Sequence, residues 1–273
     1  MNSEKNKISN IKQQSFDKIE IMAPAGNFEC LTAAIQGGAN SVYFGVENLN
    51  MRSKSANNFK ISQLAEIAEV CKNSKVKSYL TLNVVMYDDD LSDMRKIIEE
   101  AKKAGIDAVI ASDQAVINCA HEHDVKVHIS TQLNISNIEA LKFYAQYVDV
   151  VVLARELNLK QVAEIHKQIN EQQIKGPSGK PVRLEMFAHG ALCMSISGKC
   201  YLSLHEYNFS ANRGTCLQTC RRAYTVTDKE TGAQLEIDNE YIMSPKDLCT
   251  IAFLDEMIDA GISVFKIEGR ARS

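Results

Sequence analysis

Apolar segments alternate with helical patterns along most of the chain. Eight short segments are rich in β-branched and aromatic residues and are bounded by polar residues or glycine, as strands are. Continuous apolar runs, such as residues 148–153, are typical of strands that are buried on both faces of a sheet. The predicted strands are residues 19–23, 41–45, 77–85, 108–112, 126–131, 148–153, 183–188 and 263–268.

Between these strands, apolar residues recur every three or four positions, which predicts amphipathic helices. Asn27 stands where the first helix needs an N-cap. Gly37, Gly105 and Gly261 stand where a left-handed residue would end a helix. The predicted helices are residues 28–36, 61–73, 91–104, 114–123, 137–147, 158–170 and 246–260.

Eight strands that alternate with helices favour an α/β fold of the TIM type, a (β/α)8 barrel, over a doubly wound sheet. Residues 18–273 would form the barrel domain, after a polar, disordered tail at residues 1–17. The barrel would lack its last helix, because only five residues follow the eighth strand. We expect that open side to be uncovered or to be covered by a homo- or heterodimer partner. Residues 190–245 would form an insertion between the seventh strand and its helix, with a β-hairpin at residues 223–227 and 234–243.

Four of the eight cysteines lie in this insertion, where Cys193, Cys200, Cys216 and Cys220 fall within 28 residues. Glycines near them suit a backbone that turns several sulfurs toward one centre. The spacing is irregular for a zinc site, so it favours a four-iron, four-sulfur (4Fe-4S) cluster over zinc. Buried structural thiols are the remaining alternative. Cys249 is an alternative fourth ligand, since it would open a helix whose N-terminal dipole favours a thiolate.

Several blocks of sequence around and beyond the cysteines carry a family resemblance. They read Glu185-x-Phe187-x-x-Gly190-Ala191-Leu192-Cys193, Gly198-x-Cys200-x-Leu202-Ser203, Asn212-Arg213-Gly214-x-Cys216-x-Gln218-x-Cys220-Arg221, Ser244-Pro245-Lys246-Asp247-Leu248-Cys249, Lys266-Ile267-Glu268-Gly269-Arg270 and Ala23-Pro24-Ala25-Gly26-Asn27. In these blocks the chain resembles the collagenase-like peptidase U32 family over about residues 19–273. The resemblance implies a barrel enzyme with an oxygen-labile four-iron cluster and, in several members, oxygen-independent hydroxylation. It implies substrates such as a tRNA wobble uridine, a ribosomal-RNA cytidine or the ubiquinone ring, besides the older peptidase label.

Polar residues follow most of the predicted strands, at the barrel end where TIM-type enzymes hold their sites. Arg155 would bind a carboxylate or phosphate, or else pair internally with Glu156 or Glu185. The resemblance implies prephenate, a dicarboxylate, as the oxygen-donor co-substrate. His189 is a candidate proton donor or cluster neighbour, or else a hydrogen-bonded core histidine. We therefore expect catalytic roles for Arg155, His189 and Glu185. The candidate substrate-binding residues are Asn83, Gln132, Glu268 and Arg213.

Charge is unevenly distributed along the chain. The formal net charge of −3 gives no overall attraction to nucleic acid. Residues 190–224 nevertheless carry Lys199, Arg213, Arg221 and Arg222 against Glu206, a local charge of +3. This basic collar suits a phosphate-bearing substrate such as tRNA or rRNA, although four exposed cations are equally typical of a solvated face.

Other classes of protein find less support in the sequence. No apolar run approaches about 18 residues, so we expect no membrane span, and cysteines without a secretory signal indicate the cytoplasm. Residues 205–209 begin like a zinc-protease motif but end in phenylalanine. A Cys193 nucleophile with His189 as its base is conceivable for a peptidase, yet it would leave three clustered thiols unexplained.

The sequence therefore predicts an iron–sulfur enzyme that hydroxylates a pyrimidine in tRNA or rRNA. The alternatives are a collagenase-like peptidase and a cluster-bearing subunit of a heterodimeric ubiquinone-ring hydroxylase, to which an open barrel side would be suited.

Overall fold

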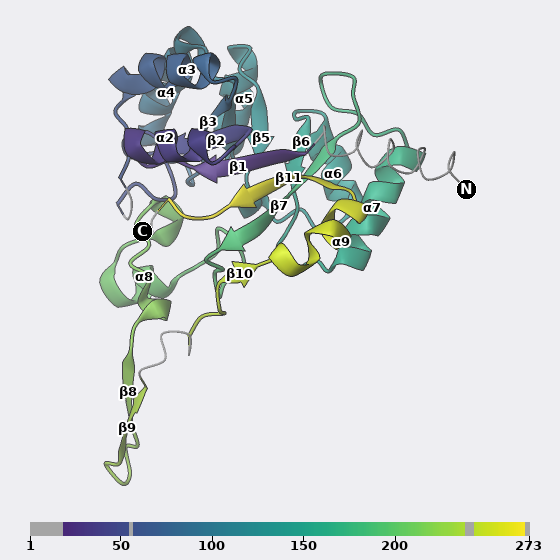
Figure 1. The fold of residues 1–273 in the computed structure, drawn as a ribbon. Coiled ribbons are helices and arrows are strands. Elements are labelled where there is room, and N and C mark those ends of the chain that lie inside the picture. The colour runs from purple at the N-terminus through teal and green to yellow at the C-terminus, as the bar shows by residue number, and fades with distance from the viewer. Residues whose placement is uncertain (1–18, 55–56, 238–242, 271–273) are drawn as a thin grey trace, which may run out of the picture.

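A curled sheet of parallel strands forms the centre of the protein in the computed structural model, which describes residues 19–54, 57–237 and 243–270 (Figure 1). The strand order is β6-β7-β11-β1-β2-β3-β4-β5, which is the order of a TIM barrel. Among the described residues, two parallel bridges, Val127–Val148 and Ile135–Leu153, link the β5 side of the sheet to the β6 side. The predicted TIM-type fold is thus confirmed. The barrel strands are β1 (Glu20–Pro24), β2 (Ser41–Gly45), β3 (Lys77–Leu82), β4 (Ala108–Ala111), β5 (Val127–Ile129), β6 (Val150–Val152), β7 (Arg183–Gly190) and β11 (Ile262–Ile267).

Helices pack on the outside of this sheet through their apolar faces. Helix α4 shows how the sequence directs this, because Met94, Ile97, Ile98 and Ala101 follow helical spacing and are all buried. It ends at Gly105, which is left-handed with φ +78°. The helices around the barrel are α2 (Phe28–Gln36), α3 (Leu64–Asn73), α4 (Leu91–Ala104), α5 (Gln114–Glu122), α6 (Ile138–Ala145), α7 (Leu159–Glu171) and α9 (Leu254–Asp259).

The predicted helix ends are mostly confirmed. The side chain of Asn27 accepts a hydrogen bond from the Cys30 N–H at 2.8 Å and so caps α2. Gly261, like Gly105, has a positive φ, of +98°. The prediction for Gly37 was wrong, because its φ is −71° and the left-handed residue is the next one, Gly38.

The helix predicted at residues 246–260 exists only in its second half. Leu248–Cys249 instead forms a short strand, β10, that pairs antiparallel with the end of β7. Both the N–H and the hydroxyl of Thr250 donate to the Ala188 carbonyl, at 3.1 and 2.9 Å. The edge of β7 therefore supplies hydrogen bonds that compete with helix formation in this segment. Cys249 does not open a helix, and the argument from the helix dipole fails for it.

The insertion between β7 and β10 lies at the carboxyl end of the barrel. It contains helix α8 (Leu202–Tyr207) and the predicted hairpin, formed by β8 (Tyr224–Thr227) and β9 (Gln234–Ile237). Figure 1 shows this hairpin pointing away from the barrel as a separate arm. Part of the second predicted strand, residues 238–242, lies outside the described residues, as does the tail at residues 1–17.

Two apolar cores hold the barrel together. The larger one lies between the sheet and the helices. The smaller one is formed by side chains of the barrel strands. Its members are Met22, Tyr43, Tyr79, Ala108, Ile110, Val150 and Val264.

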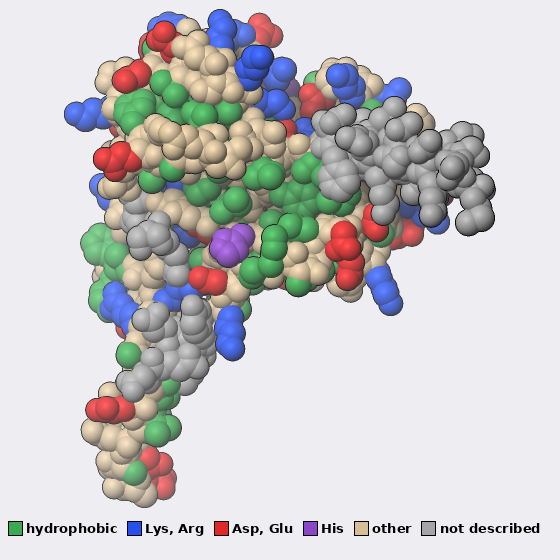
Figure 2. All heavy atoms as spheres, in the orientation of Figure 1, with side chains coloured by type: hydrophobic (Ala, Val, Ile, Leu, Met, Phe, Trp, Pro, Cys, Tyr) green, Lys and Arg blue, Asp and Glu red, His purple; other side chains and the backbone are tan. Residues whose placement is uncertain are grey.

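One side of the barrel carries exposed apolar side chains. Figure 2 shows hydrophobic side chains gathered over β1 and β11, and Ile21 on β1 is 41% exposed. This surface lies where the sequence predicts the open side of the barrel. Coverage of it by a homo- or heterodimer partner stays a prediction.

A buried ion network closes the amino-terminal end of the barrel. Glu20 is 3% exposed and accepts from Lys77 and Arg183, each at 2.8 Å, and from the Tyr79 hydroxyl at 2.6 Å. Burial alone would raise the pKa of Glu20, but these three donors outweigh it and lower the pKa to about 2. The folded protein therefore strongly favours the carboxylate form.

This network makes the free energy of unfolding depend on pH in the acidic range. Because folding lowers the pKa of Glu20 from 4.5 to about 2, its contribution is complete above pH 4.5 and is lost as the pH falls toward 2. We expect Glu20→Gln to lower the free energy of unfolding at pH 7 by about 2–3 kcal/mol and to flatten its dependence on pH below 4.5. Urea unfolding across this pH range measures both effects, and Glu66→Gln, on an exposed residue of α3, is the control. An equal loss of stability in the two variants would contradict the account.

Candidate active site at the carboxyl end of the barrel

A pocket of about 160 Å³ opens where the carboxyl ends of the strands meet the insertion. Four of the predicted site residues line it from the ends of β3, β5, β6 and β11, and these are Asn83, Gln132, Arg155 and Glu268. All four clustered cysteines line it from the other side, and these are Cys193, Cys200, Cys216 and Cys220. The structure thus brings together residues that lie up to 185 positions apart, from Asn83 to Glu268.

The four thiols are near neighbours in this pocket. Burial raises the pKa of Cys220, and the adjacent Cys216, Cys193 and Cys200 raise it further, whereas Arg221 lowers it. No three of these sulfurs lie within 4.8 Å of one another, since the one such trio of possible ligand atoms among the described residues is elsewhere. A single tetrahedral zinc would need sulfurs about 3.8 Å apart. A cluster that offers one iron to each thiolate holds its sulfurs farther apart than a single zinc does.

Glycines let the insertion approach the barrel closely. Gly190 has φ +105°, and a Cβ on it would collide with the carbonyl oxygen of Glu268. Gly198 has φ +72°, and a Cβ on it would come within 2.8 Å of the Cβ and Cγ of Gln132. Larger residues at these two positions would therefore push the cysteine loop away from the strand ends.

Arg52 is a pocket residue that the sequence analysis missed. Its Nη2 donates to Glu268 Oε1 at 3.1 Å. Burial would lower the pKa of Arg52, but Glu268, Cys216 and Cys193 together raise it above its ordinary value. The guanidinium thus lies close to two of the four thiols and brings a positive charge to their side of the pocket.

Lys266 and Arg270 add two more cations to the pocket wall. Lys266 is paired with the fully buried Glu185 at 3.2 Å, although the two are not aligned for a hydrogen bond, and its Nζ lies 4.6 Å from the centre of the Tyr43 ring. Arg270 donates to Thr81 at 2.8 Å and to Asn50, and burial lowers its pKa to about 10. The Lys-Ile-Glu-Gly-Arg block at residues 266–270 already contained the signal for both residues.

Arg155 is a pocket cation without a described acidic partner. Its Nη2 donates to the Ser197 hydroxyl at 2.8 Å, and its buried Nε has no hydrogen-bond partner among the described residues. Neither Glu156 nor Glu185, which the sequence offered as internal partners, lies within ion-pair distance of it. Its charge is therefore available to an anion in the pocket.

The structure does not bring the other predicted residues to the pocket wall. Glu185 is 0% exposed inside the barrel, where burial raises its pKa against the effect of Lys266. His189 is exposed at the end of β7, and Cys249 is exposed on β10 opposite it. Of the two candidates for a fourth ligand, Cys220 therefore lies in the pocket and Cys249 does not.

Three arginines of the basic collar form ion pairs or hydrogen bonds that hold the insertion in place. Arg213 pairs with Asp90, donates to the Val85 carbonyl at 2.6 Å and lies over the Tyr87 ring at 4.0 Å. It joins the insertion to the loop after β3 instead of lining the pocket. Arg221 pairs with Asp247 at 2.9 Å, and the guanidinium of Arg222 donates to the Tyr207 hydroxyl at 2.7 Å.

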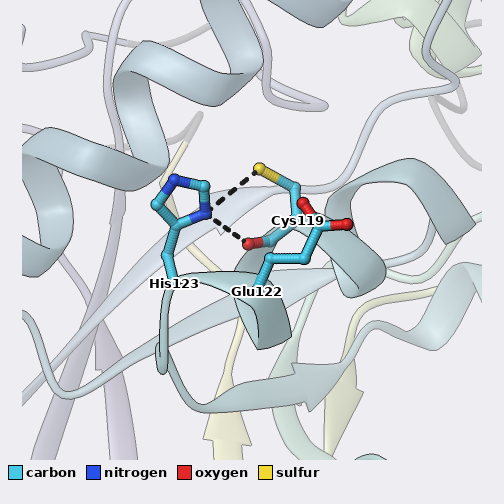
Figure 3. A group of neighbouring side chains, drawn as sticks. All are labelled: Cys119, Glu122 and His123. Atoms are coloured by element: carbon cyan, nitrogen blue, oxygen red, sulfur yellow. Dashed lines mark hydrogen bonds between the residues drawn. The ribbon is translucent and has the colours of Figure 1, made fainter.

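A second group of possible metal ligands lies at the end of α5 (Figure 3). Cys119, Glu122 and His123 come together there, but His123 Nδ1 lies 2.8 Å from the Cys119 carbonyl oxygen, as in a helix-end hydrogen bond. That bond requires a proton on Nδ1, so this nitrogen is already occupied. Glu122 in turn lies 3.6 Å from Arg95. We interpret this group as the stabilised end of a helix.

A family model and several known proteins match this chain over most of its length. The family model described as "Peptidase family U32" matches residues 26–273. A collagenase of Porphyromonas gingivalis strain W83 is 64% identical over 93% of this chain and 61% of its own length. The tRNA hydroxylation protein P1 of Bacillus subtilis strain 168 is 35% identical over 97% of this chain and 62% of its own length. A 23S rRNA 5-hydroxycytidine synthase of Escherichia coli K12 is 34% identical over 94% of this chain and 37% of its own length.

These relatives are longer than this chain, which spans about three-fifths of the first two. Among solved structures, the U32 peptidase Mk0906 matches with a TM-score of 0.56 and 12% identity, over 92% of this chain and 93% of its own. That similarity supports the fold. Within the described residues, no helix is both long and apolar enough to cross a membrane.

Proposed function

Since this chain belongs to peptidase family U32, we propose that it is an iron–sulfur enzyme that hydroxylates a pyrimidine in tRNA or ribosomal RNA without molecular oxygen. The observation that carries the proposal is the single pocket in which four thiols face the polar ends of the barrel strands. Relatives named for tRNA hydroxylation and for a 5-hydroxycytidine in rRNA support the choice of RNA. Acting on RNA would place the protein in the cytoplasm.

The four cysteine thiols of the pocket are suitable ligands for an iron–sulfur cluster. Cys193, Cys200, Cys216 and Cys220 would hold a 4Fe-4S cluster through one thiolate each. Soft thiolate ligands exclude magnesium and calcium, and the fact that no three of these sulfurs lie within 4.8 Å of one another argues against a single zinc. When bound, the cluster would supply the electron-transfer chemistry that moving an oxygen atom requires.

The balance of atoms and electrons in the proposed reaction shows that the pocket must also bind an oxygen donor. Hydroxylation at C5 breaks the ring C–H bond and forms a C–O bond, so the base loses two electrons. A donor R–OH, for which prephenate is our candidate, supplies the oxygen and is reduced to R–H, which also takes up the hydrogen. Base-H and R–OH thus give base-OH and R–H, and atoms and electrons balance without molecular oxygen.

Residues of this chain would hold the anionic donor. Arg155 has no described counter-ion, and its free guanidinium edge suits a carboxylate. Lys266 lies on the same pocket wall, although Glu185 partly neutralises it. Arg52 and Glu268 form an ion pair near Cys193 and Cys216, and they would position the reactants beside the cluster.

The test uses protein purified without oxygen. It is incubated with unmodified tRNA and rRNA fragments and with prephenate, and the nucleosides are then analysed by mass spectrometry. We expect one pyrimidine to gain the mass of an oxygen atom in the absence of air. If cluster-loaded protein added no oxygen to any RNA, even with a cell extract as the source of donor, the proposal would fail.

The collagenase names of the most similar relatives favour a peptidase as the second candidate. A cysteine peptidase would need Cys193 next to a base, for which His189 is the candidate. The structure places Cys193 in the pocket and His189 outside it, with no described hydrogen bond between them. The geometry therefore favours hydroxylation.

His189→Ala separates the two functions. On our account His189 has no part in the chemistry, so the variant should keep RNA hydroxylation within about twofold of the wild-type rate. A peptidase that uses His189 as its base would instead lose most of its cleavage of gelatin or collagen peptides. Measuring both activities on the wild type and the variant decides the matter, and loss of hydroxylation in His189→Ala would contradict our placement of the site.

A further inference from the structure

We propose that Gln132 selects the base in this pocket, and that it favours uracil over cytosine. The inference rests on the proposed function and adds the identity of the pyrimidine. It follows from a chain of hydrogen bonds that leaves only one possible orientation for the Gln132 side-chain amide.

The chain begins at a backbone donor whose direction is fixed. The Met51 N–H donates to Asn83 Oδ1 at 3.3 Å. A backbone N–H can only donate, so the oxygen of the Asn83 amide must face Met51 and its nitrogen must face the other way. Asn83 Nδ2 accordingly donates to the Ser130 hydroxyl at 3.1 Å and to Gln132 Oε1 at 3.3 Å.

The same reasoning then determines the orientation of the Gln132 side-chain amide. Its Oε1 accepts from both Asn83 and Ser130, so its Nε2 faces away from them. Among the described residues, Nε2 donates to no group, and it is not counted among the buried polar atoms that lack a partner. Gln132 lines the main pocket and also the adjoining hollow of about 110 Å³. The hydrogen-bonding group that its side chain has left for a ligand is therefore a donor and not an acceptor.

The Gln132 side chain is also held in place from the cysteine side. Gly198, two residues before Cys200, packs directly on the Cβ and Cγ of Gln132. Asn134 ties the two segments together, since its Nδ2 donates to the Gln132 carbonyl at 2.7 Å and to the Ser197 carbonyl at 2.9 Å. The Gln132 side chain thus lies against the segment that carries Cys193 and Cys200.

This position determines which part of the base Gln132 meets. In the proposed reaction C5 of the pyrimidine faces the thiol wall, and the exocyclic group nearest to C5 is the one on C4. Uracil carries a carbonyl oxygen there, which accepts a hydrogen bond, whereas cytosine carries an amino group, which donates one. A fixed donor therefore pairs with uracil and would oppose cytosine donor to donor.

The test compares two RNA stem-loops that differ only in a uridine or a cytidine at one loop position. The wild-type protein should hydroxylate the uridine with a kcat/KM about 10- to 100-fold higher, as expected for one buried hydrogen bond made or opposed. Binding of the same RNAs, followed by fluorescence anisotropy, should show the preference in the same direction.

Gln132→Glu is the decisive variant. It keeps one oxygen for Asn83 and Ser130 and replaces the donor with an acceptor at nearly constant volume. We expect the ratio of uridine to cytidine hydroxylation to fall at least tenfold, with the iron content unchanged. Gln132→Met, which removes both functions of the amide, should bring the ratio close to one.

The outcomes separate the two proposals. If the wild type hydroxylated uridine and cytidine equally, or if Gln132→Glu left the ratio unchanged while iron content was normal, the role of Gln132 would be refuted and the hydroxylase proposal would stand. If no RNA gained oxygen with any variant, the hydroxylase proposal itself would fail.

Discussion

Replacing Cys216 with serine should remove the bound iron and lower RNA hydroxylation by at least about 100-fold. Cys216 lines the pocket with the other three thiols, raises the pKa of Cys220 and lies near Arg52. A serine hydroxyl is a poor replacement for a thiolate, which soft metal centres require. The measurements are the iron content of anaerobically purified protein and the rate of oxygen addition to RNA.

Cys249→Ser is the matched control for this experiment. Cys249 is exposed to solvent, whereas Cys216 is half-buried, and like Cys216 it belongs to a sequence block of the family, but it lies on β10 outside the pocket. The control should keep its iron and its activity. If Cys249→Ser lost iron and Cys216→Ser retained it, the ligand set proposed here would be wrong.

Replacing Arg155 with alanine should raise the KM for the oxygen donor by about 10- to 100-fold and leave the iron content unchanged. A hydrogen bond to a charged group contributes about 1.5–3 kcal/mol, which corresponds to that factor. The effect should appear at this position because Arg155 has no described carboxylate to neutralise it, unlike Arg52 and Arg213. Steady-state kinetics with varied prephenate measure it.

Arg155→Lys and Arg222→Ala complete the series. Lysine keeps the positive charge but lacks the planar guanidinium group. The KM of Arg155→Lys for the oxygen donor should therefore lie between those of the wild type and the alanine variant. Arg222 is exposed and outside the pocket, so its replacement should change the KM by less than about twofold. If Arg155→Ala bound the donor as tightly as the wild type, Arg155 would have no place in the scheme.

The barrel could be predicted from the sequence because its elements depend on local patterns. The boundaries of α2 and α4 agree with the prediction to the residue, since helical spacing marks both helices, the N-cap Asn27 marks the start of α2, and the left-handed Gly105 marks the end of α4. The helix predicted over residues 246–253 did not form, because the structure of this segment does not depend on its local pattern. Its structure depends on the free edge of β7, a partner some 60 positions away that no local pattern reveals.

The cysteine pocket was also predictable, but the roles of the charged residues were only partly so. The four clustered thiols and the strand-end residues Asn83, Gln132, Arg155 and Glu268 do meet in one pocket. Arg213 looked like a free cation because the sequence does not show that Asp90 lies against it. Arg52 was missed because it follows no strand or helix pattern, and only its contact with Glu268 brings it into the site.

The measurement that tests the central claim most directly is the iron, sulfide and zinc content of the protein purified without oxygen, together with its visible absorption spectrum. We predict about four irons and four sulfides per chain and a broad brown absorption that bleaches in air. Stoichiometric zinc without sulfide, or no metal and four thiols that alkylate freely, would contradict the proposed cluster in this pocket.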